Sequence, residues 1–200
     1  GEQLGDENNG DAINTEPVNN MVQRQVDSET EVTFTSKRAE DEQNSEFLTS
    51  ADPWCRPVAV RTAPDGSLWV VDMYRHVIEH PEWIPHEWET QLDLRAGHER
   101  GRLYRVAPKG HAPLPAPDLT KLSLADLVAR LGDSSGTVRD LTQQLLTDRK
   151  PEGAEEMLAE ACRATDWRHR LHALATLDGL GPVSRPVVAD ALTDSHPAVR

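Results

Sequence analysis

The stretch VAVRTAPDGSLWVVDM, residues 58–73, decides the fold of the first half of this chain. Two short apolar runs, 58–61 and 68–73, flank the segment APDG at residues 63–66. Because the proline presets the first turn torsion and the glycine accepts a positive φ, the stretch predicts a tight antiparallel β-hairpin. A third run, GRLYRV at residues 101–106, predicts another strand after a long excursion. Short strands with this spacing are typical of propeller blades and of sandwiches.

Upstream of the hairpin the sequence is acidic and its β pattern is weaker. Residues 1–12 are rich in Gly, Asp, Asn and Glu, which predicts an irregular segment. Alternation over residues 25–36 predicts a pair of strands with a turn at residues 27–29. Residues 39–44 predict a charged loop or a short helix. A β domain is therefore expected over residues 13–106.

Downstream of the third strand the pattern changes at a proline-rich stretch. Residues 107–118 hold four of the fourteen prolines, which predicts a stiff linker and a domain boundary. Over residues 119–200 apolar side chains recur every three to four positions, which predicts helices.

An internal repeat lies within the predicted helical part. The motif LGDSSGTVR at residues 131–139 returns as LTDSHPAVR at residues 192–200, with a degenerate copy near residues 165–170. Units of about 30 residues predict a truncated HEAT-like α-solenoid. In such an array we expect each Asp to cap a helix and to pair with an Arg of the neighbouring repeat.

Composition excludes several classes of function. The 34 acidic residues outnumber the 21 basic ones for a net charge of -13, and no basic stripe suits the chain to nucleic acid. No apolar run approaches the roughly 18–20 residues that span a bilayer, so no transmembrane segment is predicted in these residues. Cys55 and Cys162 form no C-x-x-C pair, and their spacing predicts no zinc site.

The segment HVIEH at residues 76–80 matches the H-x-x-E-H pattern of inverted zinc metallopeptidases. That chemistry requires both histidines on one face of a helix. Pro81 follows directly and a predicted strand precedes the motif, so little helix is available. We therefore expect a turn in which one histidine is a hydrogen-bonding anchor, and no metal site.

Residues 54–102 combine four of the five tryptophans with many charged side chains. On a long connection, such a mixture either builds a polar pocket on a rigid β scaffold or forms Arg–carboxylate pairs that fix a loop. The residues leave both interpretations open. No Ser-His-Asp spacing, phosphate-binding glycine loop or nucleotide motif accompanies them.

An ordered series of short motifs supports a resemblance to a known family. The motifs are EPVNNMV at 16–22, RAEDE at 38–42, WCRP at 54–57, VDMYR at 71–75, IEHPEWIP at 78–85, LRAG at 94–97 and RGRLYR at 100–105. Over residues 13–200 the chain resembles the large membrane-bound dehydrogenases of planctomycete-type bacteria. This resemblance implies the C-terminal blades of a sorbosone-dehydrogenase-like β-propeller followed by HEAT repeats. We expect an internal fragment of such a protein, whose missing part commonly carries a c-type cytochrome domain with a C-x-x-C-H haem motif.

The resemblance implies a quinoprotein-type sugar or alcohol dehydrogenase, periplasmic or membrane-associated, with pyrroloquinoline quinone, calcium and haem c in the full-length protein. The fragment itself is expected to hold no cofactor and to be inactive alone. The alternative is a non-catalytic propeller and HEAT protein that serves as a scaffold, or binds a protein partner through its helical repeats. The two folds are compatible with both functions.

Several positions depart from the family pattern. Thr15 stands where a Cys is expected, and Asn19 and Gln23 stand where His is expected. His76 replaces a usual Gly, and Cys55 replaces a usual Phe. If the first three positions serve a ligand or a disulfide in the family, this chain has lost that feature.

Eight residues are expected to form one polar cluster where the hairpin end meets the excursion. Asp72 ends an apolar strand, where a buried carboxylate needs a cationic or hydrogen-bonding partner, and Arg75 and Arg56 are the nearest guanidinium groups. Glu79 and His80 precede Pro81, which restricts their backbone. In an enzyme, Asp72 or His80 would accept the hydroxyl proton of the substrate. In the structural alternative, the same cluster fixes the excursion to the sheet. The cluster consists of Arg56, Asp72, Tyr74, Arg75, Glu79, His80, Arg95 and Arg102.

Overall fold

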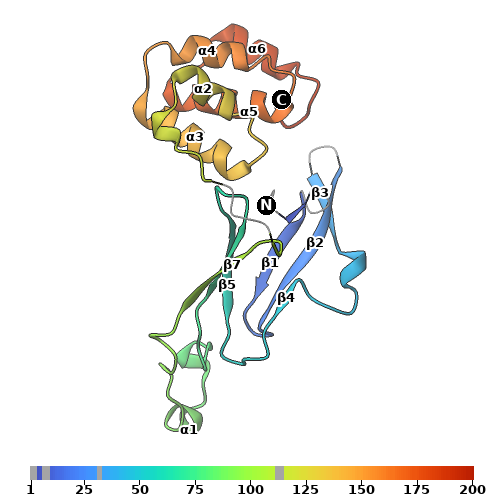
Figure 1. Ribbon diagram of the computed structural model, residues 1–200, viewed down its shortest axis with the longest axis vertical. Helices are drawn as coiled ribbons and strands as arrows, with labels where there is room; N and C mark the ends of the chain where they lie inside the picture. Colours follow the sequence, from blue (N-terminus) through green and yellow to red (C-terminus); the bar gives the residue numbers. More distant parts are fainter. Residues whose placement is uncertain (1–3, 6–9, 31–32, 111–114) are drawn as a thin grey trace.

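The computed structural model describes residues 4–5, 10–30, 33–110 and 115–200. Figure 1 shows three regions along the longest axis: most helices at one end, two sheets in the middle, and the short helix α1 (His86–Glu89) at the other end. These residues contain two antiparallel sheets and six α-helices, which confirms the predicted mixed β and α class. Within the described ranges the strands form neither a closed barrel nor a propeller.

The first sheet has the order β1-β2-β3, with a short strand on the edge of β2. Its strands are β1 (Ala12–Glu16), β2 (Met21–Thr30), β3 (Thr33–Arg38) and β4 (Leu48–Thr49). The predicted turn at residues 27–29 is wrong, because β2 continues through them to Thr30. Asp27 lies opposite Ser36 and accepts a hydrogen bond from its hydroxyl (2.6 Å). Cross-strand pairing therefore outweighs the turn preference of Asp and Ser.

The second sheet contains the predicted hairpin. Strands β5 (Pro57–Thr62) and β6 (Leu68–Asp72) pair antiparallel, and β7 (Arg102–Val106) pairs with the other edge of β6. Gly66 in the turn has a φ of 76°, a conformation that glycine adopts without strain. The hairpin and the third strand are thus confirmed.

A long connection, called the excursion and comprising residues 74–100, leaves the sheet after β6 and returns at β7. It contains the 3₁₀ helix η4 (Pro81–Trp83) and α1, and it forms the green end of the molecule in Figure 1. Because Asp72 lies opposite Arg102 in the β6–β7 register, the residues that begin and end the excursion are adjacent.

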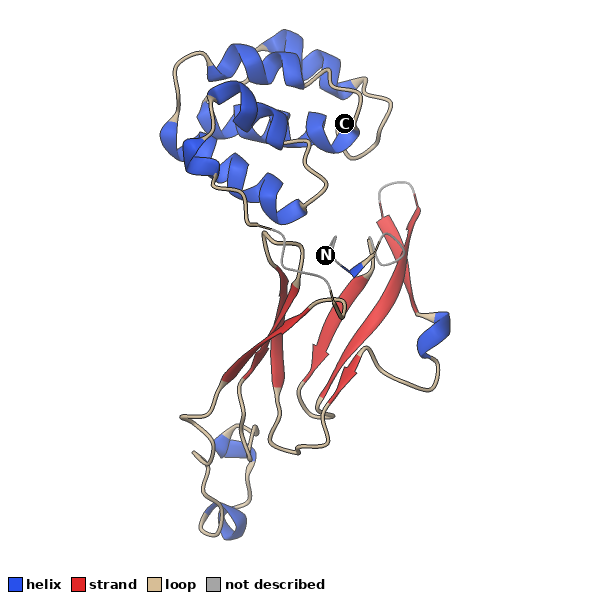
Figure 2. Ribbon diagram, viewed as in Figure 1, coloured by secondary structure: helices blue, strands red, loops and turns tan. Residues whose placement is uncertain are grey.

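The chain after residue 118 is helical, as Figure 2 shows. A 3₁₀ turn, η5 (Leu119–Lys121), precedes α2 (Leu124–Arg130), α3 (Gly136–Arg149), α4 (Ala154–Ala161), α5 (Trp167–Leu180) and α6 (Arg185–Leu192). Most of the predicted apolar positions meet in one core that includes Leu131, Leu146 and Leu158, each fully buried, whereas Leu141, Val188 and Leu192 are exposed. None of the described helices is both long and apolar enough to cross a bilayer.

Three arginines make the same backbone contact in successive helical units. Nη1 of Arg139, Arg170 and Arg200 donates in each case to the carbonyls five and six residues earlier. Intervals of 31 and 30 residues separate these arginines along the chain. The shared contact supports the internal repeat and aligns its degenerate middle copy on Arg170.

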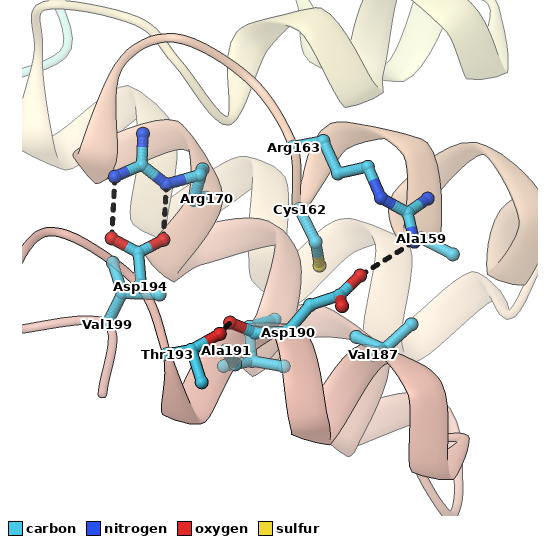
Figure 3. A pocket seen from close by; sticks show the side chains of 11 residues that line it. Ala159, Cys162, Arg163, Arg170, Val187, Asp190, Ala191, Thr193, Asp194 and Val199 are labelled. Atoms are coloured by element: carbon cyan, nitrogen blue, oxygen red, sulfur yellow. Dashed lines mark hydrogen bonds and ion pairs between the residues drawn. The ribbon is translucent and has the colours of Figure 1, made fainter.

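One of these arginines also joins two neighbouring repeats. The guanidinium of Arg170 donates through Nε and Nη2 to the two carboxylate oxygens of Asp194, at 2.7 and 2.8 Å (Figure 3). This pair confirms the predicted contact between an Arg and the Asp of the next repeat. It borders a cavity of about 300 Å³ between α4, α5 and α6, with Cys162 among its lining residues.

Arg139 lacks the partner that Arg170 has. The Nε atom of Arg139 is buried and has no hydrogen-bond partner in the described structure. The carbonyl of Ala164 accepts from Arg170 as the carbonyl of Asp194 accepts from Arg200, so positions 164 and 194 are equivalent. By this alignment, the position that corresponds to the Asp194 partner of Arg170 is, for Arg139, residue 164, where the middle repeat has alanine instead of aspartate.

Substitution Ala164→Asp is expected to raise the free energy of unfolding by about 1 kcal/mol, because it supplies a carboxylate to a buried, unpaired guanidinium nitrogen. Urea denaturation of the helical part measures this change. The gain should vanish when Arg139→Leu is introduced into the same variant. An equal gain in both backgrounds would show that the introduced carboxylate does not contact Arg139.

The Arg170–Asp194 pair predicts an acid-sensitive junction between α5 and α6. Hydrogen bonds from the Arg170 guanidinium and from the His196 amide lower the pKa of Asp194 to about 2. Because the pKa is lower in the folded chain than the ~3.9 of a free Asp, the stabilisation is complete above pH ~4 and is lost as the pH falls towards 2. Thermal unfolding followed between pH 5 and pH 2 should show this loss, and Asp194→Asn should flatten the profile.

Candidate functional site

The carboxylate of Asp72, at the end of β6, is the centre of the predicted polar cluster. Its side chain has an exposed fraction of 0%. Oδ1 accepts hydrogen bonds from the backbone amides of Arg56 (2.7 Å) and Tyr74 (2.9 Å). Oδ2 accepts from Nε and Nη2 of Arg102, at 3.0 and 2.8 Å. Both oxygens therefore accept two hydrogen bonds each from nitrogen donors.

This environment keeps Asp72 ionised. Burial alone would raise the pKa of Asp72, but the hydrogen bonds from the Arg56 amide, the Arg102 guanidinium and the Tyr74 amide outweigh it and lower the pKa. The buried Cys55 is a further partner of this carboxylate, and burial raises the pKa of its thiol. A carboxylate with a lowered pKa and no free lone pair is a weak proton acceptor.

Arg102 connects this carboxylate to the aromatic rings beside it. Its guanidinium lies 4.1 Å from the centre of the Tyr74 ring and 5.5 Å from that of Tyr104, at distances that give cation–π attraction. It also lies 3.6 Å from Asp52. The strand register thus places one arginine between a buried carboxylate, a half-exposed one and two rings.

The backbone at the base of the excursion is unusual. Tyr74 has a φ of 52°, in the left-handed region that is rare for residues other than glycine. Gly97 has a φ of 89°, and a Cβ atom at this position would lie 2.4 Å from the carbonyl oxygen of Tyr74. The excursion therefore closes on itself at a contact that only glycine permits.

Arg56 fastens the excursion to both sheets through backbone carbonyls. Its guanidinium donates to the carbonyls of Arg75 (3.1 Å) and His76 (3.3 Å), within the excursion. It also donates to the carbonyls of Pro17 (2.9 Å) and Val18 (3.2 Å), which connect β1 to β2. Four oxygen acceptors from two segments suit the fixed fork of a guanidinium, so Arg56 is a structural bridge.

Arg75 and Arg95 take part in the cluster differently from the prediction. The Arg75 guanidinium donates to the backbone carbonyl of Arg95 (3.0 Å), and the His76 amide donates to the carbonyl of Ala96 (3.3 Å). Arg95 therefore contributes its backbone to this contact. Together these bonds hold the two sides of the excursion to each other.

Glu79 and His80 lie apart from the Asp72 carboxylate. Both side chains are exposed, and Nδ1 of His80 accepts a hydrogen bond from the Glu82 amide (3.3 Å). His80 is thus a local hydrogen-bonding anchor of the kind expected for one histidine of HVIEH. His76, the other one, stacks on Trp54 with ring centres 5.2 Å apart, and residues 76–80 are not helical.

The structure therefore brings together part of the predicted cluster. Asp72 contacts Arg56, Tyr74 and Arg102 directly, and Arg75 contacts the backbone of Arg95 nearby. For Glu79 and His80, no hydrogen bond or ion pair with Asp72 is found within the described residues. The catalytic role assigned to Asp72 and His80 stays a prediction.

The structure contains a second buried charge cluster, which the sequence analysis did not predict. Arg24 in β2 pairs with Asp11 (3.2 Å), with Glu42 (3.0 Å) and with Asp41, the last two in the 3₁₀ helix η3 (Glu40–Glu42). Its side chain is 9% exposed. Arg24 lies two residues after the buried Val22 and so on the same face of the strand. The inward position of a basic residue in an acidic segment is the sequence signal that could have identified this cluster.

The charged side chains of the cluster offer few ligands for a cation. Among the described residues, no group of three or more His, Cys, Asp and Glu side chains is arranged to hold a metal ion. Around Asp72 the neighbouring groups are N–H donors and the Arg102 guanidinium, which repels cations. What this arrangement does chemically is hold backbone segments in place.

Comparison with known proteins gives one family match. The model of a family described as Domain of unknown function (DUF7133) matches residues 1–110. The matched segment contains both sheets, the excursion and the Asp72 cluster, and it ends within the predicted linker. No curated protein and no solved structure matches the chain.

Proposed function

The chain belongs to the DUF7133 family of domains of unknown function, and on that premise we propose that it is a binding module without catalysis of its own. The two sheets are the base of this module, and the excursion is the part that they present. A HEAT-like helical array follows and offers a second surface to protein partners.

One observation carries the proposal: the hydrogen bonds of the Asp72 cluster fix the base of the excursion, by joining its two sides and by attaching it to the sheets. The Asp72 carboxylate has no exposed surface, and its oxygens accept from the Arg56 and Tyr74 amides and from Arg102. A general base needs a free lone pair within reach of the substrate and a pKa near the working pH. The geometry supports a positioning role better than proton transfer.

The helical part supports the HEAT-like interpretation. The arginines of three successive units make equivalent carbonyl contacts, and Arg170 reaches the Asp of the next unit. Stacked helical pairs of this kind expose extended surfaces that bind proteins. Leu192 and Val188 on α6 are exposed, at 63% and 41%, and suit such a surface.

The second candidate is the terminal part of a quinoprotein-type dehydrogenase with a propeller fold, periplasmic or membrane-associated. The ordered motifs from EPVNNMV to RGRLYR favour it. The donor set at the cluster does not fit the implied calcium, which prefers six to eight oxygen ligands, since the Asp72 oxygens are taken by N–H donors and a guanidinium lies beside them. Quinone and haem chemistry would then belong to other parts of a larger protein.

A dye-reduction assay with the complete protein tests the two candidates. Supplied with pyrroloquinoline quinone, calcium and a panel of sugars and alcohols, a binding module should reduce the dye no faster than a protein-free blank. Turnover that disappears in a folded Asp72→Asn variant would contradict the proposal.

The Arg75→Ala variant tests the positioning role separately. It should leave the sheets folded and increase protease cleavage within residues 74–100, because the bond from Arg75 to the Arg95 carbonyl is lost. An unchanged cleavage rate, with the sheets intact by circular dichroism, would show that Arg75 does not hold the excursion.

A further inference from the structure

We propose that the outer end of the excursion, residues 79–93, docks a lysine- and arginine-rich segment of a protein partner. We call residues 79–93 of this chain the tryptophan tip. The inference rests on the proposed function, since it names the partner class of the surface that the sheets present.

Two large aromatic side chains are exposed on the tryptophan tip. Trp83 in η4 is 76% exposed and Trp88 in α1 is 57% exposed. Tryptophan in solvent forgoes the burial of a large apolar surface, and it is enriched among the residues that contribute most to protein interfaces. The two rings are therefore candidates for the anchors of an interface.

The charge of the tryptophan tip selects the partner. Its five carboxylates are those of Glu79, Glu82, Glu87, Glu89 and Asp93, and it contains neither lysine nor arginine. All five side chains are exposed. A cationic segment gains attraction to these carboxylates, and its guanidinium or ammonium groups gain cation–π contacts on the exposed indoles.

The backbone of the tryptophan tip is ordered by local hydrogen bonds. The amide of Trp83 donates to the His80 carbonyl (2.9 Å), and that of Trp88 donates to the Pro85 carbonyl (2.8 Å). The base of the excursion is fixed by Arg56 and by the close contact of Gly97 with Tyr74. A surface held in this way loses little conformational entropy when a partner binds.

A neutral sugar is the competing occupant, because pyranose rings stack on exposed indoles. Carboxylates can accept hydrogen bonds from sugar hydroxyls, but only a cationic peptide also gains a charge–charge attraction from each of the five. The observations therefore favour a basic peptide, and a sugar becomes an outcome of the test.

The probe is a fluorescein-labelled peptide of twelve residues that alternates arginine and glycine, titrated with the complete protein. We expect saturable binding that weakens when salt rises from about 0.05 to about 0.5 M. Trp83→Ala with Trp88→Ala should weaken it at least ~10-fold. Glu82→Lys with Glu87→Lys should weaken it to a similar extent. The matched control, Glu152→Lys with Glu160→Lys on the helical part, should change it less than ~2-fold.

Absence of peptide binding would overturn the inference, as would binding that the tryptophan pair does not affect. Equal losses in the tip and control charge variants would also overturn it, because net charge alone would then explain binding. A neutral gluco-oligosaccharide that binds through the two tryptophans, without peptide binding, would assign the tip to sugars. The dye-reduction assay is independent of these results, so a failed docking surface and a failed binding-module proposal remain distinguishable.

Discussion

Replacing Asp72 with alanine is expected to lower the free energy of unfolding of the sheet part by about 3 kcal/mol. The substitution leaves the partly buried amides of Arg56 and Tyr74 without their acceptor and removes the close carboxylate partner of Arg102. The expected value lies at the lower end for a buried ion pair, because Arg102 is 39% exposed and regains water contacts. Urea denaturation followed by tryptophan fluorescence measures the loss.

Asp52→Ala is the matched control for this effect. Asp52 also lies near Arg102, at 3.6 Å, but its side chain is 38% exposed. Removing it should cost less than about 1 kcal/mol, as for other exposed ion pairs. Equal losses in the two variants would show that burial does not set the importance of Asp72. Because the pKa of Asp72 is lowered on folding, the difference should also shrink in acid as the carboxylate becomes protonated.

The second large loss of stability is expected for Gly97→Ala. The new Cβ would lie 2.4 Å from the Tyr74 carbonyl oxygen, so one backbone segment must move, and the φ of 89° is itself unfavourable for alanine. We expect a loss of about 2–3 kcal/mol in the stability of the excursion. Hydrogen exchange should rise at the amide of His76, which donates to the Ala96 carbonyl across the base of the excursion, and at that of Arg75, which donates to the Trp54 carbonyl.

Gly153→Ala separates the clash from backbone strain. Gly153 has a similar φ of 82°, but a Cβ there would meet nothing within 4 Å. This variant should therefore lose about 1 kcal/mol from strain alone. If Gly97→Ala lowers stability no more than Gly153→Ala does, the approach of residue 97 to Tyr74 is not a rigid contact.

The Gly97→Ala variant also tests where the peptide is recognised. If it weakens peptide binding less than the tryptophan variants do, the residues that recognise the peptide are those of the tryptophan tip itself.

Predictions from local patterns held where the elements depend on neighbouring residues. The turn between β5 and β6 follows from Pro64 and Gly66, and the helical core follows from apolar side chains at helical spacing. The turn predicted at residues 27–29 failed because β3 pairs with these residues, and pairing with a distant strand overrides local preference. The equivalence of Ala164 to Asp194 became visible only after the arginine contacts had aligned the repeats.

The residues of the candidate site also divide into those that the sequence predicted correctly and those that it did not. The strand-end position of Asp72 predicted a cationic partner, with Arg75 and Arg56 as the nearest guanidinium groups. The structure instead pairs Asp72 with the guanidinium of Arg102, while Arg56 donates to it through the backbone amide and Arg75 donates to the Arg95 carbonyl. Glu79 and His80 were included because Pro81 restricts their backbone, but both side chains are exposed, and His80 accepts a hydrogen bond from the Glu82 amide. Arg24 was not singled out, since its carboxylate partners lie 13 to 18 residues away in sequence.

The sequence by itself determined the division into β and α segments, the hairpin, the helical repeat and the acidic character of residues 79–93, because each depends on composition or on short-range periodicity. Only the tertiary structure decided which charges meet. The pairing of Asp72 with Arg102 requires the β6–β7 register and the closure of a connection of 27 residues, residues 74–100. The entropy of such a closure depends weakly on the residues within it, so the local pattern carries little information about the partner that each charge finds.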